Sequence, residues 1–195
     1  MRITGGSARG RKLTSPRAGQ IRPTCDRVRE ALFNLIGQRI ANSRVLDLFA
    51  GTGAIGIEAL SRGAASVLFV DQSPEAGRLI ETNLRACIVR PHAAFAALNL
   101  ATTLHLHPLQ AAAAAAGRFD LAIMDPPYQK NLAQRVLAMV EEADILAEDG
   151  LIVVEEHRSA TLPASVASLA LIDHRRYGET GLWFFAPNRP YAAHE

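Results

Sequence analysis

A chain of 195 residues, 49% of them apolar, is long enough for one domain with a substantial core and leaves no room for a separate recognition domain. The two cysteines lack metal-binding spacing, and no apolar stretch is long enough to span a membrane, so we expect a cytoplasmic protein without a metal site. The net charge of +2 is uneven: residues 1–40 have nine Lys or Arg against two acids, a net +7, which leaves the remainder at −5.

The first 20 residues, rich in Gly, Arg and Ser, predict a basic arm or small hairpin outside the core, followed by a single domain over residues 21–195. Because the guanidinium group binds phosphates through a planar fork of donors, this concentration of arginine favours contact with a nucleic acid. The candidate RNA-binding residues are Arg9, Arg11, Lys12, Arg22, Arg27 and Arg29.

A helix is expected after Thr24, which can cap its first turn. Its apolar residues repeat at helical spacing and predict a face that packs on the core. These residues are Val28, Leu32, Leu35 and Ile36. Gly37 marks the end of the helix.

Residues 44–49 predict a buried strand that runs into the loop Ala50-Gly-Thr-Gly-Ala-Ile-Gly56, and then a helix that Gly63 stops. Glycines in such a loop let the backbone turn tightly and approach a ligand beside a helix N-terminus. Asp47 precedes the loop, where a carboxylate can meet the amino group of a methionyl moiety. The candidate cofactor-binding residues here are Asp47, Phe49, Gly51, Thr52 and Gly53.

The next expected strand, residues 67–71, ends in Asp71, whose side chain can accept hydrogen bonds from both hydroxyls of a ribose. Gln72 follows as a further candidate cofactor contact. Ser73 and Pro74 predict the cap and first residue of a helix. The loop and Asp71 alone fit a dinucleotide fold as well as an S-adenosylmethionine (SAM) fold, and Asp47 favours SAM.

Strands alternate with helices along the rest of the chain, which predicts a parallel sheet covered on both faces. The expected strands are residues 44–49, 67–71, about 102–107, 119–124 and 150–155. Two more, roughly 168–174 and 181–186, are joined by a short turn at Tyr177-Gly178, so one of them is antiparallel. The Ala111–Ala116 run predicts a plain helix.

The strand at 119–124 delivers Asp125-Pro126-Pro127-Tyr128 to the edge of the sheet, and these four are the candidate catalytic residues. An exocyclic base amine is a poor nucleophile because its lone pair is delocalised into the ring. A carboxylate and a backbone carbonyl can accept its two hydrogens and turn the lone pair toward an electrophile, while the aromatic ring stacks on a base taken out of its helix. The prolines keep this turn rigid and donate no hydrogen bond.

Beyond these motifs, the segments Arg2–Leu13, Arg22–Asn34, Phe49–Ala64 and Tyr177–Thr180 resemble the bacterial 16S rRNA guanine-N2 methyltransferases of the RsmD family. The resemblance covers nearly the whole chain. It implies the three-layer α/β fold of class I SAM-dependent methyltransferases, Rossmann-like, with a seven-stranded, mostly parallel sheet and an antiparallel last strand. One stretch departs from the family pattern: the family has a strand ending in Gly-Asp between Cys87 and Phe119, and Thr102–Gln110 has no such acid for the adenine.

The resemblance implies methyl transfer from SAM to the 2-amino group of a guanine in 16S rRNA, within an assembling small ribosomal subunit. We expect a monomer. Two alternatives stay open on the residues alone. Asp-Pro-Pro-Tyr also suits the adenine-N6 or cytosine-N4 amines of DNA, and a non-catalytic RNA-binding assembly factor could keep the same fold.

Overall fold

The computed structural model describes residues 1–15, 26–87, 92–103, 107–127 and 132–188. Its helices are α1 (Asp26–Ile36), the 3-10 turn η1 (Gly37–Ile40), α2 (Ala54–Ser61), α3 (Pro74–Cys87), α4 (His107–Ala116) and α5 (Leu132–Glu142). Its strands are β1 (Arg44–Leu48), β2 (Ser66–Asp71), β3 (His92–Ala97), β4 (Phe119–Met124), β5 (Leu146–His157), β6 (Ser165–Val166), β7 (Leu169–Tyr177) and β8 (Thr180–Pro187).

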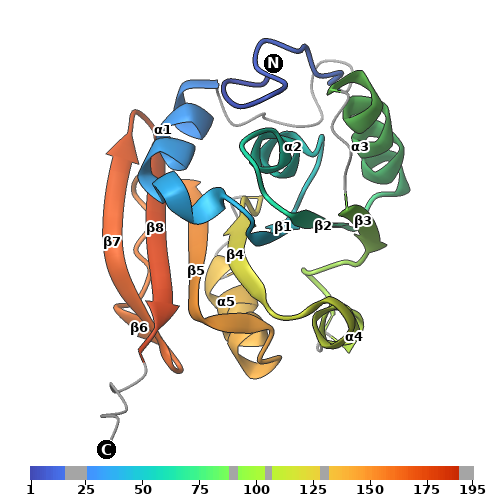
Figure 1. Ribbon diagram of the computed structural model, residues 1–195. Coiled ribbons are helices and arrows are strands. Elements are labelled where there is room, and N and C mark those ends of the chain that lie inside the picture. Colours follow the sequence, from blue (N-terminus) through green and yellow to red (C-terminus); the bar gives the residue numbers. More distant parts are fainter. Residues whose placement is uncertain (16–25, 88–91, 104–106, 128–131, 189–195) are drawn as a thin grey trace, which may run out of the picture.

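The strands form one sheet in the order β3-β2-β1-β4-β5-β8-β7-β6. Neighbours from β3 through β5 are parallel, whereas β8 is antiparallel to both β5 and β7. Helices α1, α2 and α3 cover one face of the sheet, and α4 and α5 cover the other (Figure 1). This mostly parallel, three-layer α/β architecture confirms the expected fold, and the two-residue strand β6 adds an eighth strand to the expected seven.

The expected strand at 102–107 is wrong. The third parallel strand is β3, ten residues earlier, and His107 begins α4 instead. The reason lies in composition: β3 reads His-Ala-Ala-Phe-Ala-Ala, so its residues are better helix formers than strand formers. Because β3 is an edge strand with no fully buried residue, tertiary pairing with β2 determines its conformation rather than its own propensity.

Two apolar clusters, one on each face, hold the layers together. On the first face, Val45, Ile123 and Val153 pack with residues of α1 and α2. On the other face, Leu46 and Met124 pack with residues of α4 and α5. Because side chains alternate along a strand, these clusters determine on which face each residue at the strand ends lies.

The glycine loop is packed closely against its neighbours. Gly53 has a left-handed φ of +74°, and a Cβ there would lie 2.8 Å from the Ile80 side chain. A Cβ on Gly56 would lie 2.3 Å from the Phe69 ring. Glycine at both positions therefore allows α2 to start directly above β2, with its N-terminus at the carboxyl edge of the sheet.

The N-terminal segment forms the expected small hairpin, with a bridge between Arg2 and Lys12. Its expected separation from the core is wrong, because Ile3, Ala8 and Leu13 are buried in the cluster of α1 and α2. The division at residue 20 falls outside the described residues and stays a prediction. On α1, Val28, Leu32 and Ile36 are buried as expected, whereas Leu35 is exposed.

Candidate active site

Three aspartates follow or end the central strands, and the fold brings them to the same carboxyl edge. Asp47 lies near the end of β1, Asp71 ends β2, and Asp125 follows β4. The register pairs Asp47 with Phe69 on one side and with Ile123 on the other, so the three strand ends are adjacent. The edge is therefore strongly acidic and suits a ligand with a positive charge and several hydrogen-bond donors.

The carboxylate of Asp47 is almost fully buried, with 2% of its surface exposed. Its Oδ2 accepts a hydrogen bond of 2.9 Å from the Gly56 backbone N–H at the start of α2. The pKa of Asp47 is raised to about 7, mainly by burial and to a smaller extent by the charges of Asp125 and Asp71, although the hydrogen bond from Gly56 opposes the rise. A cationic group beside Asp47 would therefore find a carboxylate that lacks charge compensation.

The Asp71 carboxylate accepts hydrogen bonds from the glycine loop and from the residue that precedes α3. Its Oδ2 accepts a 2.9 Å hydrogen bond from the Gly51 N–H, and its Oδ1 accepts one of 2.9 Å from the Ser73 N–H. The Ser73 hydroxyl accepts a hydrogen bond from the Glu75 N–H, which confirms the expected cap at the start of α3. Gln72 follows Asp71 and is exposed at the edge. These hydrogen bonds fix the orientation of the Asp71 carboxylate. Because Asp71 is partly exposed, it can also accept hydrogen bonds from the hydroxyls of a ligand.

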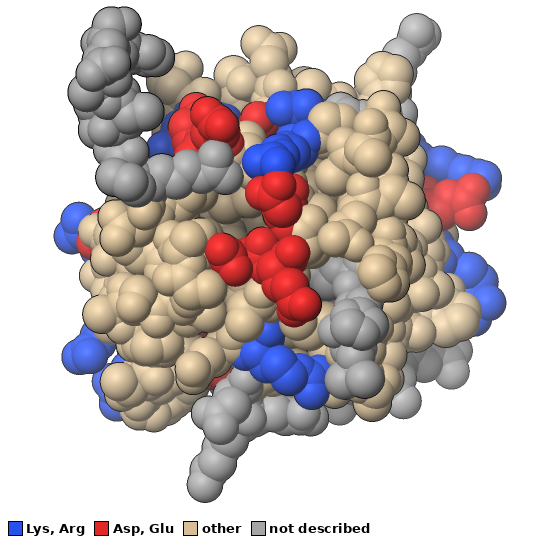
Figure 2. Space-filling view, turned by 90° about the horizontal axis from the view of Figure 1, so that it is seen from below, with Lys and Arg blue, Asp and Glu red and all other residues tan. Residues whose placement is uncertain are grey.

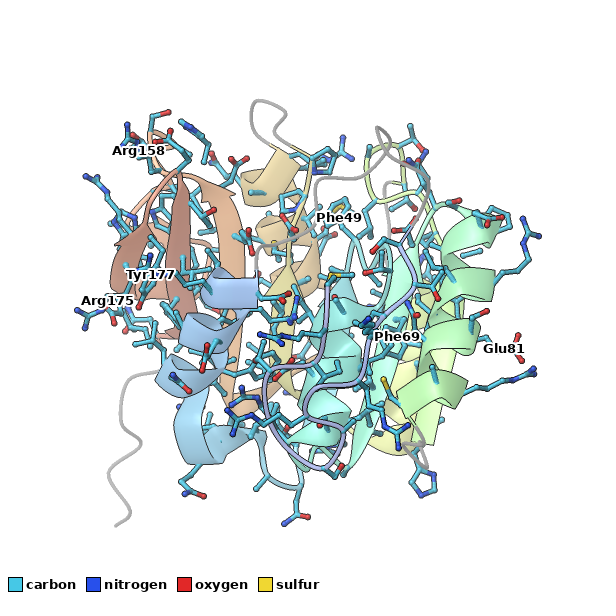
Figure 3. All side chains as sticks on the ribbon, turned by 90° about the horizontal axis from the view of Figure 1, so that it is seen from above. Phe49, Phe69, Glu81, Arg158, Arg175 and Tyr177 are labelled. Atoms are coloured by element: carbon cyan, nitrogen blue, oxygen red, sulfur yellow. The ribbon has the colours of Figure 1, made fainter. Side chains whose placement is uncertain are left out.

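Phe49 joins β1 to the glycine loop in a left-handed conformation, with φ +63°. A non-glycine residue in this region costs about 1–3 kcal/mol, and such residues cluster at functional sites. Phe49 lies centrally, with Tyr177 of β7 on one side and Glu81 of α3 on the other (Figure 3). It packs against the cluster of α4 and α5, together with Leu98 and Ala101. Thr52 is buried within the loop and Gly51 is partly exposed.

Asn99 is a candidate site residue that the sequence analysis did not include. Because the third strand is β3, the polar residue that follows it is Asn99 rather than any residue of 102–110. Leu98 donates its backbone N–H to the Asp71 carbonyl oxygen at 2.9 Å, which places the segment beside β2. The Asn99 side-chain oxygen accepts a 2.9 Å hydrogen bond from the Ala101 N–H. The Ala-rich composition of β3 hid this strand end, so no sequence signal pointed to Asn99.

The candidate catalytic residues begin where β4 ends. Asp125 donates its backbone N–H to the Leu48 carbonyl oxygen at 3.4 Å, so it continues the line of β4 beside β1. Asp125 is partly exposed, Pro126 is buried and Pro127 is exposed. Tyr128 lies outside the described residues, so its stacking role stays a prediction. The charge of Asp125 acts on Asp47, which places the two carboxylates in one site.

The candidate RNA-binding residues divide into two groups. Arg9, Arg11 and Lys12 are exposed on the hairpin, and Arg27 is exposed on α1. Arg29 is fully buried: it forms an ion pair of 3.3 Å with Glu58 and another of 3.0 Å with Asp26. Arg22 lies outside the described residues. Arg29 therefore does not belong to an RNA-facing surface, because its charge is used inside the protein.

Arg29 is held inside the protein by its ion pair with the buried Glu58 of α2. Its carboxylate, with 0% exposure, accepts 2.8 Å hydrogen bonds from the Thr4 N–H and the Thr4 hydroxyl. It also pairs with Arg29 and, at 2.8 Å, with Arg62. This network fastens the hairpin and α1 to the helix that begins at the glycine loop.

The face opposite the hairpin has a different charge. Figure 2 shows the side covered by α4 and α5, where Asp and Glu side chains gather in the middle. Among the described residues, the exposed Arg9, Arg11 and Lys12 belong to the hairpin, which lies with α1 on the other side of the sheet (Figure 1) and offers a polyanion a favourable charge. Among the described residues, no group of three or more His, Cys, Asp or Glu is arranged to hold a metal ion. None of the described helices has the length and apolarity of a membrane span.

Comparison with known proteins identifies the family of the chain. The family model described as "Conserved hypothetical protein 95" matches residues 1–186. YlbH of Bacillus subtilis is 38% identical over 182 residues, covering 93% of this chain and 96% of the relative. Ribosomal RNA small subunit methyltransferase D of Escherichia coli (strain K12) is 34% identical over 171 residues, 88% of this chain and 82% of the relative. The solved structure of Escherichia coli yhhF covers 96% of this chain and 97% of its own at 30% identity, with a TM-score of 0.78.

The fold and the acidic glycine-loop site define a class I SAM-dependent methyltransferase. A structure solved with SAH, SMU.776, has the same fold at a TM-score of 0.60 and 17% identity, covering 82% of this chain and 48% of its own. Within this class, the chain belongs to the Conserved hypothetical protein 95 family, which includes the RsmD methyltransferases whose motifs it resembles.

Proposed function

We propose that this protein methylates the exocyclic 2-amino group of a guanine in small-subunit rRNA. The observation that supports this proposal most strongly is the placement of Asp125 at the carboxyl edge beside Asp47 and the glycine loop. The relatives named ribosomal RNA small subunit methyltransferase D, in Escherichia coli and Haemophilus influenzae, support rRNA as the substrate at 34% and 35% identity. Exposed Arg9, Arg11 and Lys12 provide a basic surface for its phosphates.

The residues at the edge fit SAM. The buried Asp47, with its raised pKa, suits the ammonium of the methionyl moiety. Asp71 suits the ribose hydroxyls, and the backbone of Gly51 and Gly53 allows the close approach of a ligand. We assign Asn99, at the end of the next strand, to the adenine. When bound, SAM supplies an electrophilic methyl group on a sulfonium.

Catalysis in this proposal is mainly positioning. The carboxylate of Asp125 and a backbone carbonyl of the following diproline accept the two hydrogens of the amine, which turns its lone pair toward the methyl group. No strong base is required, because the methylated nitrogen is acidic and releases its proton readily. Asp125 orients the amine and accepts or relays that proton. Tyr128 stacks on the base once it leaves its helix.

The test uses purified protein, 16S rRNA or small subunits, and SAM with an isotopically labelled methyl group, followed by nucleoside analysis. Asp125→Ala should abolish turnover and leave the dissociation constant for SAM nearly unchanged. Asp120→Asn is the matched control, because Asp120 lies on the same strand, at its other end, where it pairs with Arg44 at 3.1 Å. Normal turnover by Asp125→Ala at saturating SAM, or a methylated adenine or cytosine as product, would overturn the proposal.

A further inference from the structure

Glu155 lies beside Asp125 on the same face of the sheet. In β5, Leu151 and Val153 pack in the cluster of α1 and α2, and in β4 Ile123 does the same. Side chains alternate along a strand, so Glu155 and Asp125 project from this face too. The register of β4 and β5 ends with the pair Met124 and Val154, and Asp125 and Glu155 are the next residues along these neighbouring chains, which run about 4.8 Å apart.

Glu155 lies in poorly solvated surroundings, which strengthen the hydrogen bonds that its carboxylate accepts. It is 4% exposed, and on its other side the register pairs it with Leu182 of β8, which is fully buried. In the sheet, the Glu155 backbone therefore lies between Leu182 on one side and the strand that leads to Asp125 on the other. In such a poorly solvated place, a hydrogen bond to a charged group is stronger than in water. The methyl-transfer steps described above make no use of this residue.

A second carboxylate at this position can distinguish guanine from the other bases by its hydrogen-bonding groups. Guanine presents two adjacent donors on its Watson–Crick edge, the 2-amino group and N1–H. Adenine at N1 and cytosine at N3 present a lone pair instead, next to their own amines. A carboxylate beside the amine site attracts the guanine N1–H and repels those lone pairs. A site that hydrogen-bonds one substrate group discriminates strongly against an analogue that lacks it.

We propose that Glu155 is a specificity-determining residue that accepts the N1–H of the target guanine while Asp125 holds its 2-amino group. This inference rests on the proposed function and adds the reason why guanine, rather than adenine or cytosine, is the substrate. Glu155 belongs to β5 and Asp125 directly follows β4, so the register of these two neighbouring strands brings the two residues side by side.

The experiment replaces the target guanine in the rRNA with 2-aminopurine, which keeps the 2-amino group but has a lone pair at N1. The measured quantity is the ratio of kcat/KM for guanine to kcat/KM for 2-aminopurine. The wild type should favour guanine, and Glu155→Gln should reduce the ratio by about 10- to 100-fold, because an amide can donate to the N1 lone pair. The matched control is Glu156→Gln, whose side chain projects from the opposite face and accepts the His157 N–H. It should keep the wild-type ratio.

A second variant, Glu155→Asp, retains the charge on a shorter side chain. It should keep the preference for guanine while its rates fall with both substrates. Calorimetric SAM binding by each variant checks that it is folded. An unchanged ratio in Glu155→Gln, with guanine methylated by the wild type, would overturn this inference alone. Methylation of adenine or cytosine by the wild type would overturn the proposed function and this inference with it.

Discussion

Replacing Asp47 with Asn should stabilise the protein and weaken its binding of SAM. The carboxylate is buried at the end of β1, and its pKa in the folded state is about 7 against an ordinary value of 3.8. The folded state therefore holds a proton that the unfolded chain has already released between these two values. Stability is highest when Asp47 is protonated, falls as the pH rises from about 4 to about 7, and is constant above that.

The size of the stability change follows from the pKa shift of Asp47. Each pKa unit corresponds to about 1.4 kcal/mol, so ionised Asp47 costs the folded state at most roughly 4 kcal/mol above pH 7. Asn is neutral at every pH, and its side-chain oxygen can still accept the Gly56 N–H. Asp47→Asn should therefore be more stable than the wild type, by about 2 kcal/mol more at pH 8 than at pH 5.5. SAM affinity should fall about 10- to 100-fold, because the ammonium loses its ionic partner.

Urea denaturation without cofactor at both pH values measures the stability difference, and titration calorimetry measures the affinity for SAM. In the wild type, SAM binding should strengthen as the pH rises from 6 to 8, since the ionised carboxylate is the form that binds. Lower stability of Asp47→Asn than of the wild type at pH 8, or a difference that does not change with pH, would refute the reasoning.

Gly56→Ala should destabilise the protein by about 1–3 kcal/mol in urea denaturation, because the added Cβ would lie 2.3 Å from the Phe69 ring; a neutral effect would show that this contact relaxes freely. Glu58→Ala should cost about 3–5 kcal/mol, because it removes the buried carboxylate that pairs with both Arg29 and Arg62. Glu81→Ala, which removes an exposed pair with Arg85, should cost less than about 1 kcal/mol, so similar values for the two variants would contradict the role of burial. Replacing both Arg9 and Arg11 by Gln should weaken rRNA binding and reduce its salt dependence without changing the affinity for SAM. Filter binding at several salt concentrations measures the slope of log binding constant against log salt concentration, and an unchanged slope would show that the hairpin does not contact RNA.

The central part of the fold was predictable because its signals are strong. β1, β2 and β4 are mostly apolar runs with an Asp near the end, at the end or directly after it, and a glycine-rich loop follows the first of them. The geometry of parallel strands then brings Asp47, Asp71 and Asp125 to one edge. The order of these motifs along the chain was therefore sufficient to predict where they meet.

The remaining features depend on tertiary contacts. β3 is a strand because it pairs with β2, although its alanines favour a helix, and the misplaced strand also concealed Asn99. Arg29 has the sequence context of a surface cation, yet Glu58, 29 residues further along the chain, pairs with it inside the protein. Glu155 lies near the end of β5, after an apolar run, where solvated acids are common. Only its neighbour in the register, Asp125, gives it a candidate role.

The most direct test is nucleoside mass spectrometry of small-subunit rRNA from cells that lack this gene, beside cells to which the wild type or Asp125→Ala has been restored. We expect one N2-methylguanine to disappear with the gene, to return with the wild type and to stay absent with Asp125→Ala. Unchanged rRNA together with the loss of a methylated adenine or cytosine from DNA would contradict the account.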